Sequence, residues 1–200
     1  MYGSDFPSGA VTLSWTIEAC ISDVKVWVVQ NKLPLNDDKT GILLIGSAPG
    51  INLPSSVRVG QSDISFSSAA RNLGVIFDSE LALKEQVNKL CQPAYLEIRR
   101  IASIRQYLSL EATRTLVSSL VLSWLDYCNA FLAGSPQVLL VKIQRVINCS
   151  AHLIYKAPKS ARITSLLFEL DWLPISSRIQ YKIALTCYHI VFGTAPPYLS

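Results

Sequence analysis

Two groups of side chains in this sequence are of types that could bind a metal ion. The adjacent carboxylates Asp37 and Asp38 could hold a divalent cation, but an Asn-Asp-Asp-Lys run is typical of a turn. Cys149 and His152 are three residues apart, as on one face of a helix, and Cys128 could supply a third ligand. A structural zinc site needs four ligands, usually in two close pairs, and Cys128 has no near partner. We therefore expect reduced core thiols and no metal site.

Charge is distributed unevenly along the chain. Residues 1–80 carry five basic and eight acidic side chains, a net charge of −3, whereas residues 81–200 carry 13 basic and six acidic ones, a net charge of +7. A basic second half favours contact with a polyanion such as nucleic acid, because Lys and Arg neutralise phosphates. A solvated surface with no partner is the alternative.

The overall composition excludes several classes of protein. Half of the 200 residues are hydrophobic and only 16% are charged, which argues against intrinsic disorder. The longest apolar stretch, residues 116–134, contains Asp126 and Asn129 and is better interpreted as a buried helix than as a membrane span. The N-terminal residues lack the basic and apolar regions of a secretion signal, so we expect an intracellular protein of the cytoplasm or nucleus.

The first 80 residues contain patterns of both helix and strand. Apolar residues four, three and four apart predict an amphipathic helix over residues 14–31, with Ser14 as its N-cap. A Pro-Asn-Asp cluster ends this pattern, and the apolar run GILLIG predicts a short buried strand over residues 41–46. Residues 56–66 are typical of a hairpin, and NLGVIF predicts a further strand over residues 72–77.

After residue 80 the apolar spacing becomes helical. A stripe from Leu83 to Ile101 predicts one long helix, in which Pro93 should cause a kink or a break because it removes a backbone donor. Further helices are expected over residues 110–133, after Pro136, around residues 163–170 and after Pro174. The patterns together predict an α+β chain: a small mixed α/β part with short antiparallel strands over residues 1–80, then a mostly α-helical bundle over residues 81–200.

Several longer sequence segments occur together and in a fixed order. They are VKVWVVQNKLPLNDDKTGILLIG, ARNLGVIFDSEL, LVSSLVLSWLDYCNAFLAGSP, KIQRVINCSAHLIY and LFELDWLPISSRIQYKIALTCYHIVFGTAPPYL. In combination they resemble the downstream part of the reverse transcriptase of non-LTR retrotransposons, the jockey-like LINE group, over residues 14–200. The resemblance implies the end of a polymerase palm over residues 14–46, primer-grip strands up to Phe77, and a helical thumb with a C-terminal extension beyond them.

The resemblance also implies what this chain lacks. In the family, two metal-binding aspartates stand in an aromatic-Ala-Asp-Asp box upstream of the helix that contains Trp27, and this sequence has no such box. Asp5 stands in a superficially similar run, but the second acidic residue is missing. Because phosphoryl transfer by two metal ions needs converging carboxylates, we expect that an upstream polymerase segment is missing, and that this chain is inactive alone and binds no cofactor itself. The intact family enzyme uses Mg²⁺.

Lys39 is the candidate catalytic residue that remains. It matches the lysine that the family is proposed to use as a general acid toward the departing pyrophosphate, and an exposed turn lysine is the alternative. The chain departs from the family pattern at Gly41, Trp124 and Asp171. These departures suggest a remnant of a retrotransposon that is accumulating substitutions.

The thumb interpretation gives the basic residues of the second half a role. They could line an RNA/DNA primer–template duplex through phosphate contacts, which are independent of sequence and sensitive to salt. The candidates are Arg99, Arg100, Arg105, Arg114, Lys142 and Arg145. We expect no membrane contact and leave the oligomeric state open. The alternatives are a domesticated helical module that binds another protein, or an inert pseudogene product.

Overall fold

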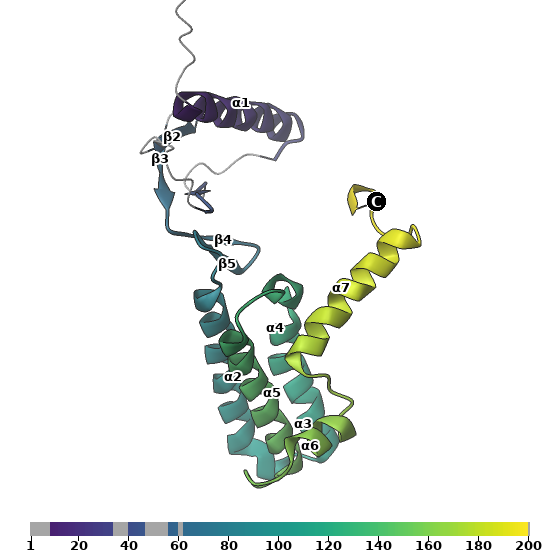
Figure 1. Ribbon diagram of the computed structural model, residues 1–200. Coiled ribbons are helices and arrows are strands. Elements are labelled where there is room, and N and C mark those ends of the chain that lie inside the picture. The colour runs from purple at the N-terminus through teal and green to yellow at the C-terminus, as the bar shows by residue number, and fades with distance from the viewer. Residues whose placement is uncertain (1–8, 34–39, 47–55, 60–61, 200) are drawn as a thin grey trace, which may run out of the picture. The chain divides into compact units, whose positions relative to one another are not determined.

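The chain divides into two compact units. A computed structural model describes residues 9–33, 40–46, 56–59 and 62–199, and its contacts separate residues 1–82 from residues 83–200 (Figure 1). The division falls two residues beyond the boundary that the sequence predicts. Each unit is described separately.

The first unit combines one helix with short strands. Helix α1 (Gly9–Gln30) begins five residues before the predicted N-cap and packs against β2 (Ser56–Val59), where the Arg58 main-chain N–H donates to a Glu18 carboxylate oxygen at 3.4 Å. β2 pairs antiparallel with β3 (Ser62–Ser67) as a hairpin, as the sequence predicts. β1 (Ile42–Leu43) pairs with the other edge of β3 in parallel, so the prediction of antiparallel strands is wrong for this pair.

A second hairpin replaces the single strand that was predicted over residues 72–77. β4 (Ala69–Asn72) and β5 (Val75–Asp78) pair antiparallel and turn at Leu73 and Gly74. Both turn residues have positive φ, 46° and 87°, as in the two-residue turns that match the twist of paired strands. The apolar run NLGVIF therefore contains a turn, and the prediction of one strand there is wrong.

The second unit is a helical bundle. Its α-helices are α2 (Lys84–Ile104), α3 (Leu110–Val117), α4 (Ser123–Asp126), α5 (Gln137–Tyr155), α6 (Ile163–Glu169) and α7 (Ile175–Val191). Short non-α turns are η2 (Arg105–Tyr107), η3 (Ser118–Leu122), η4 (Asn129–Leu132) and η5 (Pro197–Leu199). A mixed α+β chain is thus confirmed.

The structure rules out the break that was one of the two alternatives predicted at Pro93, and it corrects the single helix predicted over residues 110–133. α2 continues through Pro93 without a break, because apolar side chains on both sides of the proline, including Leu90 and Ala94, are buried in the core. The single helix predicted over residues 110–133 is interrupted by the π-helical turn η3 and again at Cys128, whose φ of 54° ends the helical path.

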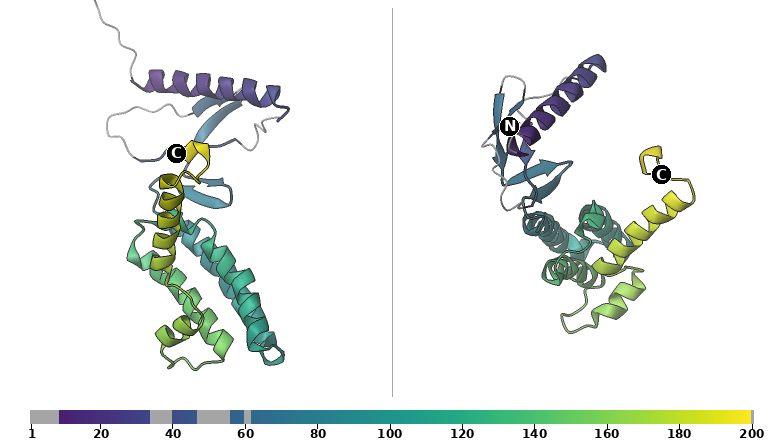
Figure 2. Two further views of the ribbon diagram at one scale, coloured as in Figure 1. Left: turned by 90° about the vertical axis from the view of Figure 1, so that its right-hand side faces the viewer. Right: turned by 45° about the horizontal axis from the view of Figure 1, so that its top comes forward.

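Helices α2, α3 and α5 enclose the core of this unit. α2 and α5 lie side by side in all views (Figures 1 and 2), and their buried stripes meet with Val87, Ile143 and Ile147 fully enclosed. These are the stripes that the helical spacing predicts. Lys142 meets Asn88 near the start of both helices, and Arg105 meets Leu153 and Ile154 near the end of both, so the two helices run parallel.

Helix α7 is packed at only one end. Ile175 and Ile179 are buried against the bundle, whereas residues 180–189 are all exposed and the helix projects from the bundle (Figures 1 and 2). None of the described helices is long and apolar enough to cross a membrane.

Candidate nucleic-acid interface

One side of the bundle gathers cations from two helices. Lys142 and Arg145 project from α5, and Lys84 and Arg99 project from α2 on the side that faces α5. We call these four residues the α2–α5 basic surface. On α2 this placement follows from helical spacing, because Lys84 lies four residues before Asn88 and Arg99 lies four residues after Tyr95.

Contacts across the two helices fix the register of this surface. The Lys142 ammonium donates to the Asn88 side-chain oxygen at 3.1 Å, and Arg145 lies close enough to Tyr95 to affect its ionisation. Arg145 and Arg99 are exposed, while Lys142 is half-buried by its contact with α2. The cations therefore form a row along the groove between α2 and α5.

The groups beneath this row are kept neutral by their surroundings. Burial raises the pKa of Tyr95, nearby Cys149 and Cys91 raise it further, and Arg145 opposes the shift. Burial likewise raises the pKa of the Cys91 thiol above its ordinary value of 9.0, against the pull of the Lys142 charge. The floor of the surface thus adds no negative charge near neutral pH.

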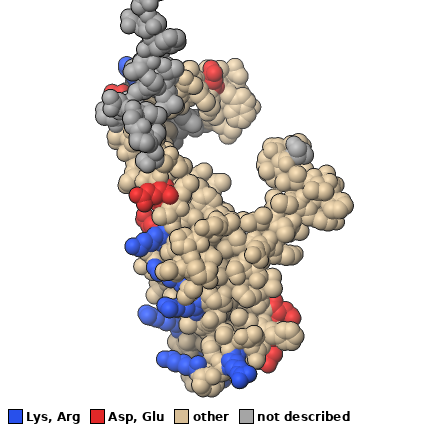
Figure 3. Space-filling model, in the orientation of Figure 1, with Lys and Arg blue, Asp and Glu red and all other residues tan. Residues whose placement is uncertain are grey.

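Few carboxylates accompany these cations. α5 contains no Asp or Glu, and on α2 Glu97 pairs with Arg100 at 2.6 Å on a different side of the helix. Glu85 stands in the first turn of α2, where a negative charge complements the helix dipole. Figure 3 shows Lys and Arg side chains along the α2 side of the unit and acidic side chains toward the α6 side.

Arg105 does not belong to this surface, although the sequence places it among the duplex-binding candidates. Only 8% of Arg105 is exposed, and its guanidinium donates to the main-chain oxygens of Leu153 at 3.0 Å, Ile154 at 2.5 Å and Leu108 at 2.8 Å. These oxygens belong to the end of α5 and to the turn after α2, which need donors. The Arg105 side chain joins two elements of the bundle and is not available to a phosphate.

Arg114 and Arg100 also lie apart from the row. Arg114 on α3 is half-buried and donates to the Leu170 main-chain oxygen at 3.3 Å. Arg100 points away from α5 and is paired with Glu97. The structure therefore brings together three of the six predicted residues: Arg99, Lys142 and Arg145. Sequence reasoning missed Lys84, although its position four residues before Asn88 is a signal for the same helix face.

The structure does not describe the predicted catalytic lysine or the adjacent aspartates. Lys39, Asp37 and Asp38 lie outside the described residues. Across the described part of the chain, no three His, Cys, Asp or Glu side chains come together as a metal-binding group.

Comparison with known proteins identifies no relative. No protein-family model matches this chain, and neither the curated proteins nor the solved structures include a significant match to it.

Proposed function

We propose that this chain is part of the reverse transcriptase of a non-LTR retrotransposon, and that residues 83–200 act as a thumb that holds an RNA/DNA primer–template duplex. Without the aspartate box the chain is inactive alone. The proposal rests on the sequence resemblance for the family, and on the α2–α5 basic surface for duplex binding.

The observation that carries duplex binding is the row of four cations on two parallel helices. Side chains from two adjacent helices could each meet a phosphate, and contacts of this kind supply affinity without reading the base sequence. Glu85 lies three residues before Asn88 and so on the same side of α2, and α5 has no carboxylate, so four cations outnumber one carboxylate on this surface.

The test is binding of the full chain to a fluorescent RNA/DNA duplex over a series of salt concentrations. We expect the Arg99→Glu, Arg145→Glu double variant to bind more weakly and to lose slope in a plot of log affinity against log salt, by about 0.7 to 0.9 for each contact removed. A matched control, Lys159→Glu with Arg162→Glu, makes the same charge change on exposed residues between α5 and α6. Equal loss in both variants, or no binding by a folded chain, would contradict the proposal.

Catalytic inactivity has its own test. A primer-extension assay with Mg²⁺ should yield no product from the purified chain, because converging carboxylates are needed to hold two metal ions. Metal-dependent DNA synthesis by this chain would show that the interpretation of the missing box is wrong.

A further inference from the structure

The exposed part of α7 carries cations and aromatic rings on the same side of the helix. A step of about 100° per residue places seven residues within roughly a third of its circumference. They are Arg178, Tyr181, Lys182, Leu185, Tyr188, His189 and Phe192, which we call the basic-aromatic face. Its rings are open to solvent, with exposed fractions of 60% for Tyr181, 54% for Tyr188 and 63% for Phe192.

Packing against the bundle explains only the inner end of this face, where Arg178 pairs with Asp126 and α7 contacts η4. The residues that attach α7 to the core are Ile175 and Ile179, which are 3% and 4% exposed, and the same stripe continues through Ile183. The basic-aromatic face lies on another side of the helix. Its rings therefore need an explanation other than folding of the bundle.

The net charge of this face is positive. The sequence contains no Asp or Glu from Trp172 to Ser200. Asp126, which approaches from α4, is neutralised by Arg178, whose Nη1 atom lies 2.6 Å from its carboxylate. Among the described residues Lys182 has no ion-pair partner, so its ammonium is free to meet an anion.

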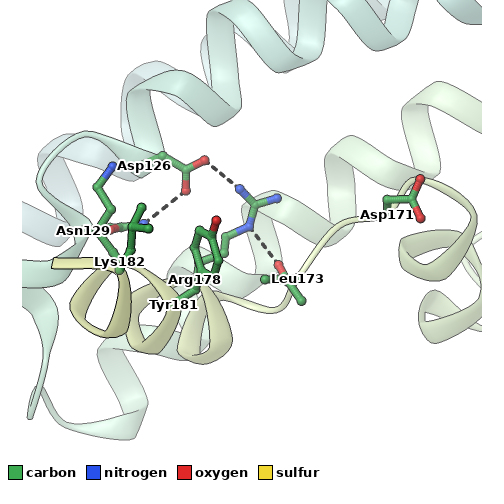
Figure 4. A pocket seen from close by; sticks show the side chains of 8 residues that line it. Asp126, Asn129, Asp171, Leu173, Arg178, Tyr181 and Lys182 are labelled. Atoms are coloured by element: carbon green, nitrogen blue, oxygen red, sulfur yellow. Dashed lines mark hydrogen bonds and ion pairs between the residues drawn. The ribbon is translucent and has the colours of Figure 1, made fainter. Parts of the chain in front are cut away.

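A pocket of about 280 Å³ lies where this face meets the bundle (Figure 4). Tyr181 and Lys182 line it from α7, and Asp126 and Asn129 line it from the opposite wall, while Asp171 stands at the far end from Lys182. The buried Asn129 Oδ1 atom in this wall accepts no hydrogen bond.

The rings at the outer end of the face are held by local contacts. Tyr188 and Phe192 lie 4.3 Å apart between ring centroids, and Tyr188 meets His189 edge to face at 5.9 Å. The His189 Nδ1 atom lies 2.7 Å from the Thr194 hydroxyl, which fixes the imidazole. Rings that are already ordered lose little conformational entropy when a planar ligand stacks on them.

The arrangement suits a single strand of nucleic acid better than a lipid surface. Helices that lie on membranes separate an apolar face from a face of Lys and Arg. On α7 the cations and the tyrosines share one side, as they must if phosphates and bases are contacted in alternation. We propose that the basic-aromatic face binds single-stranded nucleic acid, with bases stacked on Tyr181 and Tyr188 and phosphates beside Lys182.

The experiment measures binding of the full chain to a labelled oligo(dT) of about ten nucleotides, a length within the usual range of single-strand sites, and to oligo(rU) of equal length. We expect Tyr181→Leu and Tyr188→Leu each to weaken binding by about fivefold or more, the loss of one stacked base. Tyr181→Phe and Tyr188→Phe keep the ring and should bind like the natural chain. The matched control is Tyr107→Leu, an aromatic that is 80% exposed in η2.

The inference is independent of the proposed duplex binding, and the variants separate the two. The Arg99→Glu, Arg145→Glu chain should still bind the oligonucleotide, and the Tyr181→Leu chain should still bind the duplex. Unchanged oligonucleotide binding in both leucine variants would overturn the inference. Binding to vesicles that contain phosphatidylserine, without binding to either oligonucleotide, would overturn it in favour of a lipid surface.

Discussion

The Arg105 Nη2 atom donates a hydrogen bond to the Ile154 main-chain oxygen, 2.5 Å away, across 49 positions of sequence. The same guanidinium also donates to Leu153 and Leu108, so one side chain satisfies three main-chain oxygens near the ends of α2 and α5. A planar group with five donors is suited to this role, and a lysine ammonium is not.

Replacing Arg105 with Met should destabilise the 83–200 unit by about 3 kcal/mol, because buried carbonyl oxygens at the end of α5 lose a charged donor. Urea unfolding followed by far-UV circular dichroism measures this change. Arg105→Lys should also be clearly destabilised, since an ammonium cannot donate to all three main-chain oxygens in the way that the planar guanidinium does.

The exposed Arg99→Met variant is the matched control and should unfold near the natural urea concentration. If Arg105→Met were as stable as the natural chain and bound duplex more weakly, Arg105 would be a nucleic-acid ligand after all.

The serine that caps α3 offers a second prediction. Ser109 Oγ accepts a hydrogen bond from the Ala112 main-chain N–H at 3.1 Å. Ser109→Ala should lower the free energy of unfolding by about 1 kcal/mol, since the first turn of α3 loses this acceptor. Thermal unfolding by circular dichroism provides the measurement.

Ser103→Ala gives the comparison within α2. The Ser103 hydroxyl donates to the Arg100 main-chain oxygen inside the helix, where alanine is the better helix former. This variant should be neutral or slightly more stable. Equal losses from the two serine variants would show that Ser109 does not act as a cap.

The parts of the fold that the sequence predicts are those with a clear period. The stripes that include Val87 on α2 and Ile147 on α5 are buried as expected, because spacings of three and four residues define one helix face. The path after Val117 could not be predicted, since no period in residues 116–134 distinguishes a π-helical turn from an α-helix.

The candidate site was also predictable from the sequence only in part. The sequence identifies the cations, but whether they share one surface depends on how α5 aligns with α2. The Lys142–Asn88 hydrogen bond and the nearness of the Arg145 charge to Tyr95 establish that alignment. Arg105 follows Ile98 and Ile101 by seven and four residues, so helical spacing places it on the buried stripe, unlike Arg99. Tertiary folding brings carbonyl oxygens from 48 and 49 residues away to its guanidinium.

Isoleucines in the two kinds of helix segment should respond differently to truncation. Ile147 on α5 is completely buried, so Ile147→Ala should cost about 2 to 5 kcal/mol through lost burial and a residual cavity. Ile183 lies on the projecting part of α7 and is 39% exposed, so Ile183→Ala should cost much less. Urea denaturation of both variants tests this, and similar losses would mean that α7 packs against the bundle in solution.

Cys91 should make the stability of the 83–200 unit decrease in alkaline solution. Burial raises the pKa of this thiol above 9.0, so the folded state retains a proton that the unfolded state releases. The resulting stabilisation is fully present below pH 9 and is lost as the pH rises through the folded-state pKa. With a reductant present, the free energy of unfolding of the natural chain should fall as the pH rises above 9.0.

Cys91→Ala removes the titrating thiol, so its stability should change less over the same pH range, whatever the variant loses in packing. Cys187→Ala, which replaces an exposed thiol on α7, should retain the decrease seen in the natural chain. The comparison depends on the slope of stability against pH and not on its absolute value, because a cavity at position 91 shifts the whole curve. Parallel curves for all three chains would show that ionisation of Cys91 is not coupled to folding.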